Sequence, residues 1–225
     1  KKCILYSAFD GKSAGSYVDE AVAHATLTRE HLPEDVDLIL YTPHDGVTNS
    51  VFDHIYVNFD GAKRKRSYYK ILSLCELADS HYDQVIYLDT DAHFVSPNAL
   101  DMFDVLSRFD IAAAHAPIPG RHATSIPSSF PEYNGGVIAF NTLRDVRVLF
   151  RSWLALYTSP DYGLANDQKA FRHVLYNSTI RIATLPKSYN YRAGVEKGSL
   201  YENSFPKNNS WVRVLHTFGP TRFKK

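Results

Sequence analysis

Val85-Ile86-Tyr87-Leu88-Asp89-Thr90-Asp91 carries the densest chemical signal in the chain. Four apolar residues, typical of a buried strand, are followed directly by two acidic residues one position apart. A strand that ends in this way delivers its carboxylates to the carboxyl edge of a parallel sheet, where open α/β folds bind ligands. If the chain stays extended, Asp89 and Asp91 lie on the same side and can both face one hard divalent cation. The pattern therefore predicts a metal site at a sheet edge.

Two other interpretations of this stretch stay open. An isolated Asp-X-Asp is most often a solvated turn, because Asp is common at turn positions, but its place after four apolar strand residues favours a metal. A phosphatase of the haloacid-dehalogenase type would also carry Asp-X-Asp after its first strand, with the first Asp as nucleophile. Here three predicted strands precede Asp89, and the residue four positions later is His93. The phosphatase is therefore the alternative function.

The rest of the chain alternates short apolar runs with stretches of helical periodicity, which is typical of an α/β domain with a largely parallel sheet. The near-continuous apolar character of the runs predicts strands that are buried on both faces. Strands are predicted at residues 3–9, 36–42, 54–59, 84–89, 110–116, 135–141, 179–185 and 212–217. Helices are predicted at residues 16–31, 67–80, 143–159 and 166–176. Residues 117–131 and 193–210 are predicted loops that could shape a substrate site.

The composition excludes several classes of protein. The 225 residues suffice for one sizeable core, and 25 Lys and Arg against 24 Asp and Glu argue against a dedicated nucleic-acid binder. Two cysteines, Cys3 and Cys75, cannot form a disulfide framework. No apolar run approaches the ~18 residues of a membrane span. Because the chain starts at Lys1 without Met, we expect that an upstream signal, anchor or further domain could have been removed.

Taken together, the motifs resemble those of the glycogenin-like, family 8 nucleotide-sugar glycosyltransferases. Any one of them is weak, but the chain carries six in the family's order over residues 70–225. They are Tyr69-Lys70-Ile71-Leu72, Tyr87-Leu88-Asp89-Thr90-Asp91, Tyr133-Asn134-Gly135-Gly136-Val137-Ile138, Asn166-Asp167-Gln168, Leu185-Pro186-Lys187-Ser188-Tyr189-Asn190 and Val214-Leu215-His216-Thr217-Phe218-Gly219.

The resemblance implies a GT-A fold, a single Rossmann-like α/β domain with a central mixed, mostly parallel sheet flanked by helices. Residues 1–116 would then form the nucleotide-binding part and residues 117–225 the sugar and acceptor part. The implied activity is metal-dependent transfer of a hexose from a UDP-sugar, UDP-glucose or UDP-galactose, to a hydroxyl of a saccharide or glycoconjugate acceptor. Retention of configuration is implied by the resemblance alone. A non-catalytic nucleotide-sugar-binding module is a second alternative.

The compartment and the metal are further expectations, and only the metal follows from the resemblance. A cytoplasmic enzyme is expected, or one in the Golgi lumen if an N-terminal anchor has been removed. Asp89 and Asp91 would hold the metal, with His216 as the third protein ligand. Because imidazole favours a transition metal, Mn²⁺ is the expected cofactor, with Mg²⁺ as a substitute. The metal would neutralise the charge that builds up on the departing diphosphate.

The remaining site residues are assigned by the same resemblance. Asp167 and Gln168 would be catalytic, with Asp167 near the reacting anomeric carbon, either as nucleophile or as electrostatic helper. The residues expected to bind the sugar are Asn134, Gly135 and Gly136. Those expected to bind the nucleotide and its diphosphate are Ala8, Phe9, Asp10, Tyr17, Arg66, Lys70, Thr90, Gly219 and Arg222. Arg222 departs from the family, which has lysine there, and this keeps the charge but changes its geometry.

Overall fold

A computed structural model describes residues 1–9, 16–48, 50–57, 66–116, 126–160, 167–192 and 210–217, with the backbone alone for Ser16 and Arg66. Within these residues, a seven-stranded sheet has the order β3-β2-β1-β4-β7-β6-β8. All of its neighbouring strands are parallel except β7, which runs antiparallel to both β4 and β6. The predicted mixed, mostly parallel sheet is confirmed. Its strands are β1 (Lys2–Ser7), β2 (Val36–Thr42), β3 (His54–Val57), β4 (Gln84–Leu88), β6 (Ile111–His115), β7 (Tyr133–Asn141) and β8 (Ile182–Leu185).

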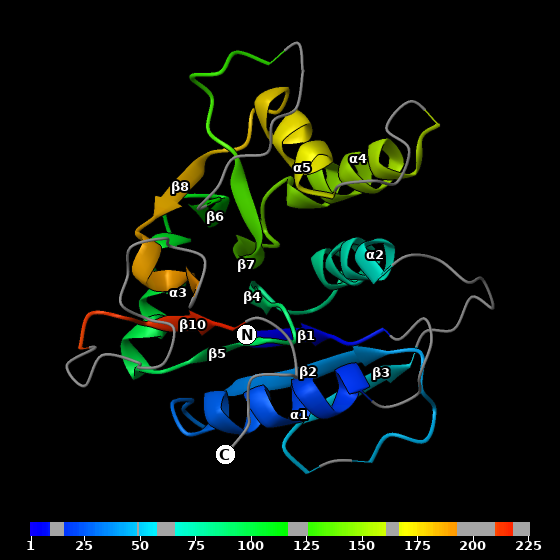
Figure 1. Cartoon of the computed structure of the whole chain (residues 1–225), viewed down its shortest axis with the longest axis vertical. Helices are drawn as coiled ribbons and strands as arrows, with labels where there is room; N and C mark the ends of the chain where they lie inside the picture. The colour runs from blue at the N-terminus through cyan, green and yellow to red at the C-terminus, as the bar shows by residue number, and fades with distance from the viewer. Residues whose placement is uncertain are drawn as a thin grey trace.

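Helices cover both faces of this sheet, as the continuous apolar strands predict. Alternate residues of β1 belong to different cores: Cys3 and Leu5 pack in one, Ile4 and Tyr6 in the other. The first core contains residues of α2, α4 and α5, which are grouped together in Figure 1, and the second contains residues of α1 and α3. The helices are α1 (Ser16–Arg29), α2 (Arg66–Ala78), α3 (Met102–Val105), α4 (Val146–Thr158) and α5 (Asp167–Tyr176).

One helix boundary differs from its prediction for an identifiable reason. α4 begins at Val146, whereas the periodicity predicts a start at Leu143. The backbone N–H of Leu143 donates to the side chain of Asn141 at 3.0 Å, which forms a turn in place of a helical hydrogen bond. Leu143 is exposed as a result. None of the described helices is long and apolar enough to cross a membrane.

A second, three-stranded sheet lies beyond the end of β4. Its order is β5-β10-β9, with β10 (Val214–His216) antiparallel to β5 (Ala92–Phe94) and parallel to β9 (Tyr191–Arg192). The sequence predicts a longer strand at residues 212–217, of which β10 is a part, but neither β5 nor β9, because these two segments contain no continuous apolar run. Two short 3₁₀ turns, η1 (Pro97–Asp101) and η2 (Lys187–Tyr189), complete the described elements. This small sheet pairs His216 with Ala92, directly after the Asp-X-Asp stretch.

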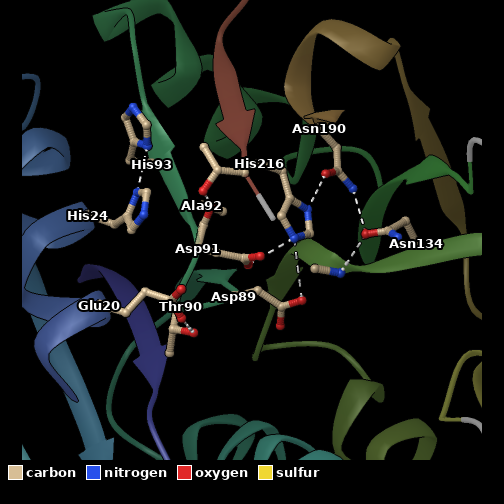
Figure 2. Close-up of polar contacts among 12 residues, drawn as sticks. Glu20, His24, Asp89, Thr90, Asp91, Ala92, His93, Asn134, Asn190 and His216 are labelled. Carbon is tan, nitrogen blue, oxygen red and sulfur yellow. Dashed lines mark hydrogen bonds and ion pairs between the residues drawn. The ribbon is translucent and has the colours of Figure 1, made fainter. Parts of the chain in front are cut away.

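Two buried histidines join α1 to β5. Nδ1 of His24 and Nδ1 of His93 are 2.8 Å apart, and the side chains are drawn in Figure 2. Both are buried, His24 at 1% and His93 at 7% exposure. Burial is the main cause that lowers the pKa of His24 to about 4 and that of His93 to about 3. The pair is therefore neutral in the folded protein at neutral pH and shares a single proton in its hydrogen bond.

This pair predicts a specific loss of stability in acid. Below the ordinary histidine pKa near 6.5 the unfolded chain binds protons that the folded chain excludes, so the free energy of unfolding falls as the pH decreases. We expect a loss of about 2 kcal/mol per histidine between pH 7 and pH 5, measured by urea unfolding. A His24→Asn/His93→Asn variant, whose amides keep one hydrogen bond but do not titrate, should lose this part of the pH dependence. Replacement of the exposed His81 by Asn should leave it unchanged, and an identical pH slope in all three proteins would contradict the assignment.

Candidate active site

The acidic stretch after β4 forms a turn and not an extended segment. The N–H of Ala92 donates to the carbonyl of Asp89 at 2.9 Å, and the N–H of Asp89 donates to the carbonyl of Gly136 in β7 at 2.8 Å. The expectation that Asp89 and Asp91 share a side because the chain stays extended is therefore wrong in its geometry. Their carboxylates still converge with His216. Thr217 donates its N–H to the carbonyl of Asp91 at 2.7 Å, which holds the end of β10 beside the turn.

Asp89, Asp91 and His216 form a cluster that could hold a metal ion. One ligand atom from each residue lies within 4.8 Å of the others. Nε2 of His216 is 3.0 Å from Oδ1 of Asp91 and 3.8 Å from Oδ2 of Asp89. Figure 2 draws both contacts as dashed lines. His216 is buried, whereas both carboxylates are partly open to solvent. Two carboxylates with one imidazole are a donor set that suits a divalent transition metal, so the residues fit the expected Mn²⁺.

Lys70 supplies the opposite charge beside this cluster. It projects from α2, and its Nζ lies 3.4 Å from Oδ1 of Asp89 and 3.2 Å from Oδ2 of Asp167. The hydroxyl of Tyr87 donates to the same Asp89 oxygen at 2.7 Å. Since Lys70 is largely buried, its ammonium lies between two carboxylates in a setting of reduced solvent screening. One cation thus joins the end of β4 to the start of α5.

The predicted sugar end of the site is closely packed. Asp167 and Gln168 begin α5, as predicted, and the carbonyl of Asp167 accepts a hydrogen bond from the indole N–H of Trp153 at 2.9 Å. Gln168 accepts at Oε1 from Nδ2 of Asn134 at 2.9 Å and donates through Nε2 to Oε1 of Glu132 at 3.0 Å. Asn134 is only 2% exposed, so its amide takes part in the protein's own hydrogen bonds. Its contact with a sugar remains a prediction.

Two glycines of β7 let the strand approach the charged residues. A Cβ added to Gly136 would overlap the His216 ring and lie 2.8 Å from Oδ2 of Asp89. A Cβ on Gly135 would lie 3.2 Å from Nζ of Lys70, closer than side chains normally pack. At Gly136 no side chain fits, because the His216 ring and the Asp89 carboxylate occupy the space. The structure thus gives these residues a packing role, while their predicted contact with sugar is untested.

These groups line one pocket at the carboxyl edge of the main sheet. The pocket contains most of the residues predicted for the site from β4 onwards, together with four that the sequence analysis does not assign. Its lining is Ser7, Ser67, Lys70, Tyr87, Asp89, Thr90, Asp91, Asn134, Gly136, Asp167, Gln168, Arg192 and His216.

Ser7 is the most informative of the unassigned residues. It is the last residue of β1, is 5% exposed, and its hydroxyl finds no hydrogen-bond partner among the described residues. A buried polar atom without a partner costs free energy unless a ligand or water satisfies it. In the sequence Ser7 falls inside the strand predicted at residues 3–9, so no signal singles it out, and only the observed end of β1 reveals its position.

The residues predicted to bind the nucleotide are largely buried or bonded to other protein groups. Ala8 and Phe9 are buried, and the Phe9 ring stacks on Tyr69 with 4.2 Å between ring centroids, so it packs inside the protein. Tyr17 is half-buried against the second core. The hydroxyl of Thr90 donates to Oε2 of buried Glu20 at 2.6 Å.

The side chains of four further predicted residues are not described. Asp10, Gly219 and Arg222 lie outside the described residues. The backbone of Arg66 begins α2, one turn before Lys70, but its side chain is not described. The nucleotide contacts of these residues therefore stay predictions.

Comparison with solved structures places this arrangement among known folds. A glycosyltransferase, GlyE of Streptococcus pneumoniae TIGR4, superimposes with a TM-score of 0.62 at 15% identity, covering 96% of this chain and 54% of GlyE. The galactosyltransferase LgtC, solved with donor and acceptor sugar analogues, superimposes with a TM-score of 0.59 at 16% identity. The match covers 97% of this chain and 87% of LgtC. A glycosyltransferase involved in the glycosylation of the major capsid of PBCV-1 superimposes with a TM-score of 0.62 at 11% identity. The match covers 99% of this chain and 95% of that protein.

No protein-family model and no curated protein matches the sequence. The chain spans about half the length of GlyE, 54%. At identities of 11% to 16% this likeness establishes the fold alone. The chain therefore has the GT-A fold of these glycosyltransferases.

Proposed function

We propose that this chain is a metal-dependent, retaining glycosyltransferase that moves a hexose from a UDP-sugar to an acceptor hydroxyl. The observation that supports it best is the convergence of Asp89, Asp91 and His216 in one pocket with Lys70 and Asp167, at the carboxyl edge of a GT-A sheet. LgtC, which shares this fold, was solved with donor and acceptor sugar analogues. A saccharide or glycoconjugate is therefore proposed as the acceptor, and UDP-glucose or UDP-galactose as the donor.

Each charged residue has a role in this proposal. Asp89, Asp91 and His216 would hold Mn²⁺, which when bound supplies positive charge to the two phosphates of the departing UDP. Lys70 lies within 3.4 Å of two carboxylates and would exchange one of these contacts for a diphosphate oxygen. Asp167 would then face the positive charge that develops at the anomeric carbon.

The hydrogen bonds around the pocket would keep these groups in position. Tyr87 holds Asp89, Trp153 holds the first turn of α5, and Gln168 is held from two sides. A site whose side chains are fixed before substrate arrives needs little rearrangement in the transition state. In a front-side transfer, an oxygen of the departing diphosphate would take the proton of the acceptor hydroxyl.

Donor hydrolysis tests the proposal and the metal assignment together. The unaltered chain should hydrolyse one UDP-sugar of a panel of nucleotide sugars in the presence of Mn²⁺, and EDTA should stop the reaction. Asp89→Asn should lower kcat/KM about 100-fold or more, because it removes one charged ligand. Asp104→Asn, the same change on an exposed residue of α3, should have no effect.

Other results would overturn specific parts of the proposal. Full activity of Asp89→Asn would contradict the metal site. Binding of UDP without turnover of any donor would favour the non-catalytic module. Proton NMR of the first product formed would give the anomeric configuration, and an inverted product would contradict retention.

Ser7 gives a second, independent test. If its hydroxyl binds the donor, Ser7→Ala should raise the donor KM about three- to tenfold, the worth of one hydrogen bond, with kcat little changed. The same variant should melt at an equal or higher temperature, because it removes a buried polar atom without a described partner. Ser80→Ala, which removes a hydroxyl bonded to the carbonyl of Leu77, should leave KM unchanged. An unchanged KM in Ser7→Ala would exclude the contact.

A further inference from the structure

A continuous chain of side-chain hydrogen bonds runs from the start of β7 to the candidate metal ligand on β10. Gln168 donates to Glu132 at 3.0 Å, Asn134 donates to Gln168 at 2.9 Å, and Asn190 donates to Asn134 at 2.8 Å. Nδ1 of His216 then lies 2.8 Å from Oδ1 of Asn190. Asn134, Asn190 and His216 are drawn together in Figure 2, and each is at most 6% exposed.

The direction of this chain is fixed by a backbone group. The N–H of Gly136 donates to the side-chain atom of Asn134 that lies 2.9 Å away, so that atom must be the oxygen Oδ1. The amide group of Asn190 that contacts the same oxygen must therefore be its NH₂ group. Its other end, which faces His216, is then the carbonyl oxygen, which can only accept.

The far end of the chain gives the same direction independently. Glu132 is a carboxylate that accepts from Nε2 of Gln168, so Oε1 of Gln168 must face Asn134 as an acceptor. Nδ2 of Asn134 then points to Gln168 as a donor, which again leaves Oδ1 for Gly136 and Asn190. The Gly136 N–H and the Glu132 carboxylate thus require the same orientation of the amides between them. No amide in this series of hydrogen bonds can be turned round without losing hydrogen bonds.

This direction decides which nitrogen of His216 carries hydrogen. Nδ1 must donate to Asn190, so the lone pair of the neutral ring is on Nε2. Nε2 is the atom that lies 3.0 Å from Asp91 and 3.8 Å from Asp89. In the neutral ring this lone pair faces the two carboxylates, which is the form of histidine that can bind a metal ion together with them.

We infer that Asn190 is a positioning residue that holds His216 in its metal-binding tautomer, and that Asn134 and Gly136 in turn fix the direction of Asn190. The inference rests on the proposed metal-dependent function and assigns roles within that site. Asn190 does not line the pocket with the metal cluster, so it acts through His216. Asn134 and Gln168 do line it, so the chain links the sugar end of the pocket to the metal end.

The test is the affinity for Mn²⁺ alone, measured without donor by electron paramagnetic resonance of the free ion. Asn190→Leu keeps the size of the side chain but removes the acceptor for Nδ1, so the dissociation constant should rise about 10- to 100-fold. Asn190→Asp keeps an acceptor for Nδ1 but loses the donor to Asn134, so it should bind Mn²⁺ more weakly than the unaltered chain and clearly more tightly than Asn190→Leu. Asn190→Ser, too short to reach the ring, repeats the test if the leucine variant does not fold.

A matched control separates positioning from a general structural effect. Asn141, at the end of β7, is a buried asparagine like Asn190. Its amide donates to the carbonyl of Leu106 at 3.1 Å, outside the pocket that contains Asp89, Asp91 and His216. Asn141→Leu should lower the melting temperature and leave Mn²⁺ affinity unchanged, whereas Asn190→Leu should change the affinity.

The possible failures are distinguishable. Absence of Mn²⁺ binding in the unaltered chain would overturn the proposed function and this inference with it. Normal binding by the unaltered chain and equal binding by Asn190→Leu would overturn the inference alone. Equal loss in Asn190→Asp and Asn190→Leu would contradict the acceptor role of Asn190.

Discussion

The close approach of Gly136 to the turn after β4 is the contact on which the candidate site depends. Its carbonyl accepts from the N–H of Asp89, and its own N–H donates to Asn134. Where its side chain would lie, the His216 ring and the carboxylate of Asp89 already fill the space. Because Gly136 has no Cβ, β7 can hold the hydrogen-bonded Asn134 and still leave space for His216 and Asp89.

The small sheet turns this local contact into a site assembled from distant parts of the sequence. The pairing of β10 with β5 places His216 opposite Ala92, and the Thr217 N–H fixes the strand to the carbonyl of Asp91. The hydrogen bond between His24 and His93 in turn joins β5 to α1. The main sheet thus delivers the two carboxylates, and the small sheet delivers the imidazole.

Apolar runs were sufficient to predict the central strands β1, β2, β4 and β7 of the main sheet, because these strands are buried on both faces. β2 has the predicted bounds 36–42, and α5 starts within one residue of its prediction. β5 and β9 could not be predicted, because neither segment forms a continuous apolar run. The role of Asn190 could not be predicted either: it stands in a quoted motif, but its partner His216 is 26 residues away and only the tertiary structure joins them.

Several residues that the sequence suggests as direct ligand contacts are bonded to the protein itself. The amide of Asn134 and the hydroxyl of Thr90 both have protein partners, whereas the hydroxyl of Ser7, which the sequence did not single out, has none among the described residues. Residue type alone cannot separate these cases, because an amide that orients a metal ligand and one that binds a sugar are chemically the same. What separates them is whether folding has already used their hydrogen bonds, and for Asn134 it has.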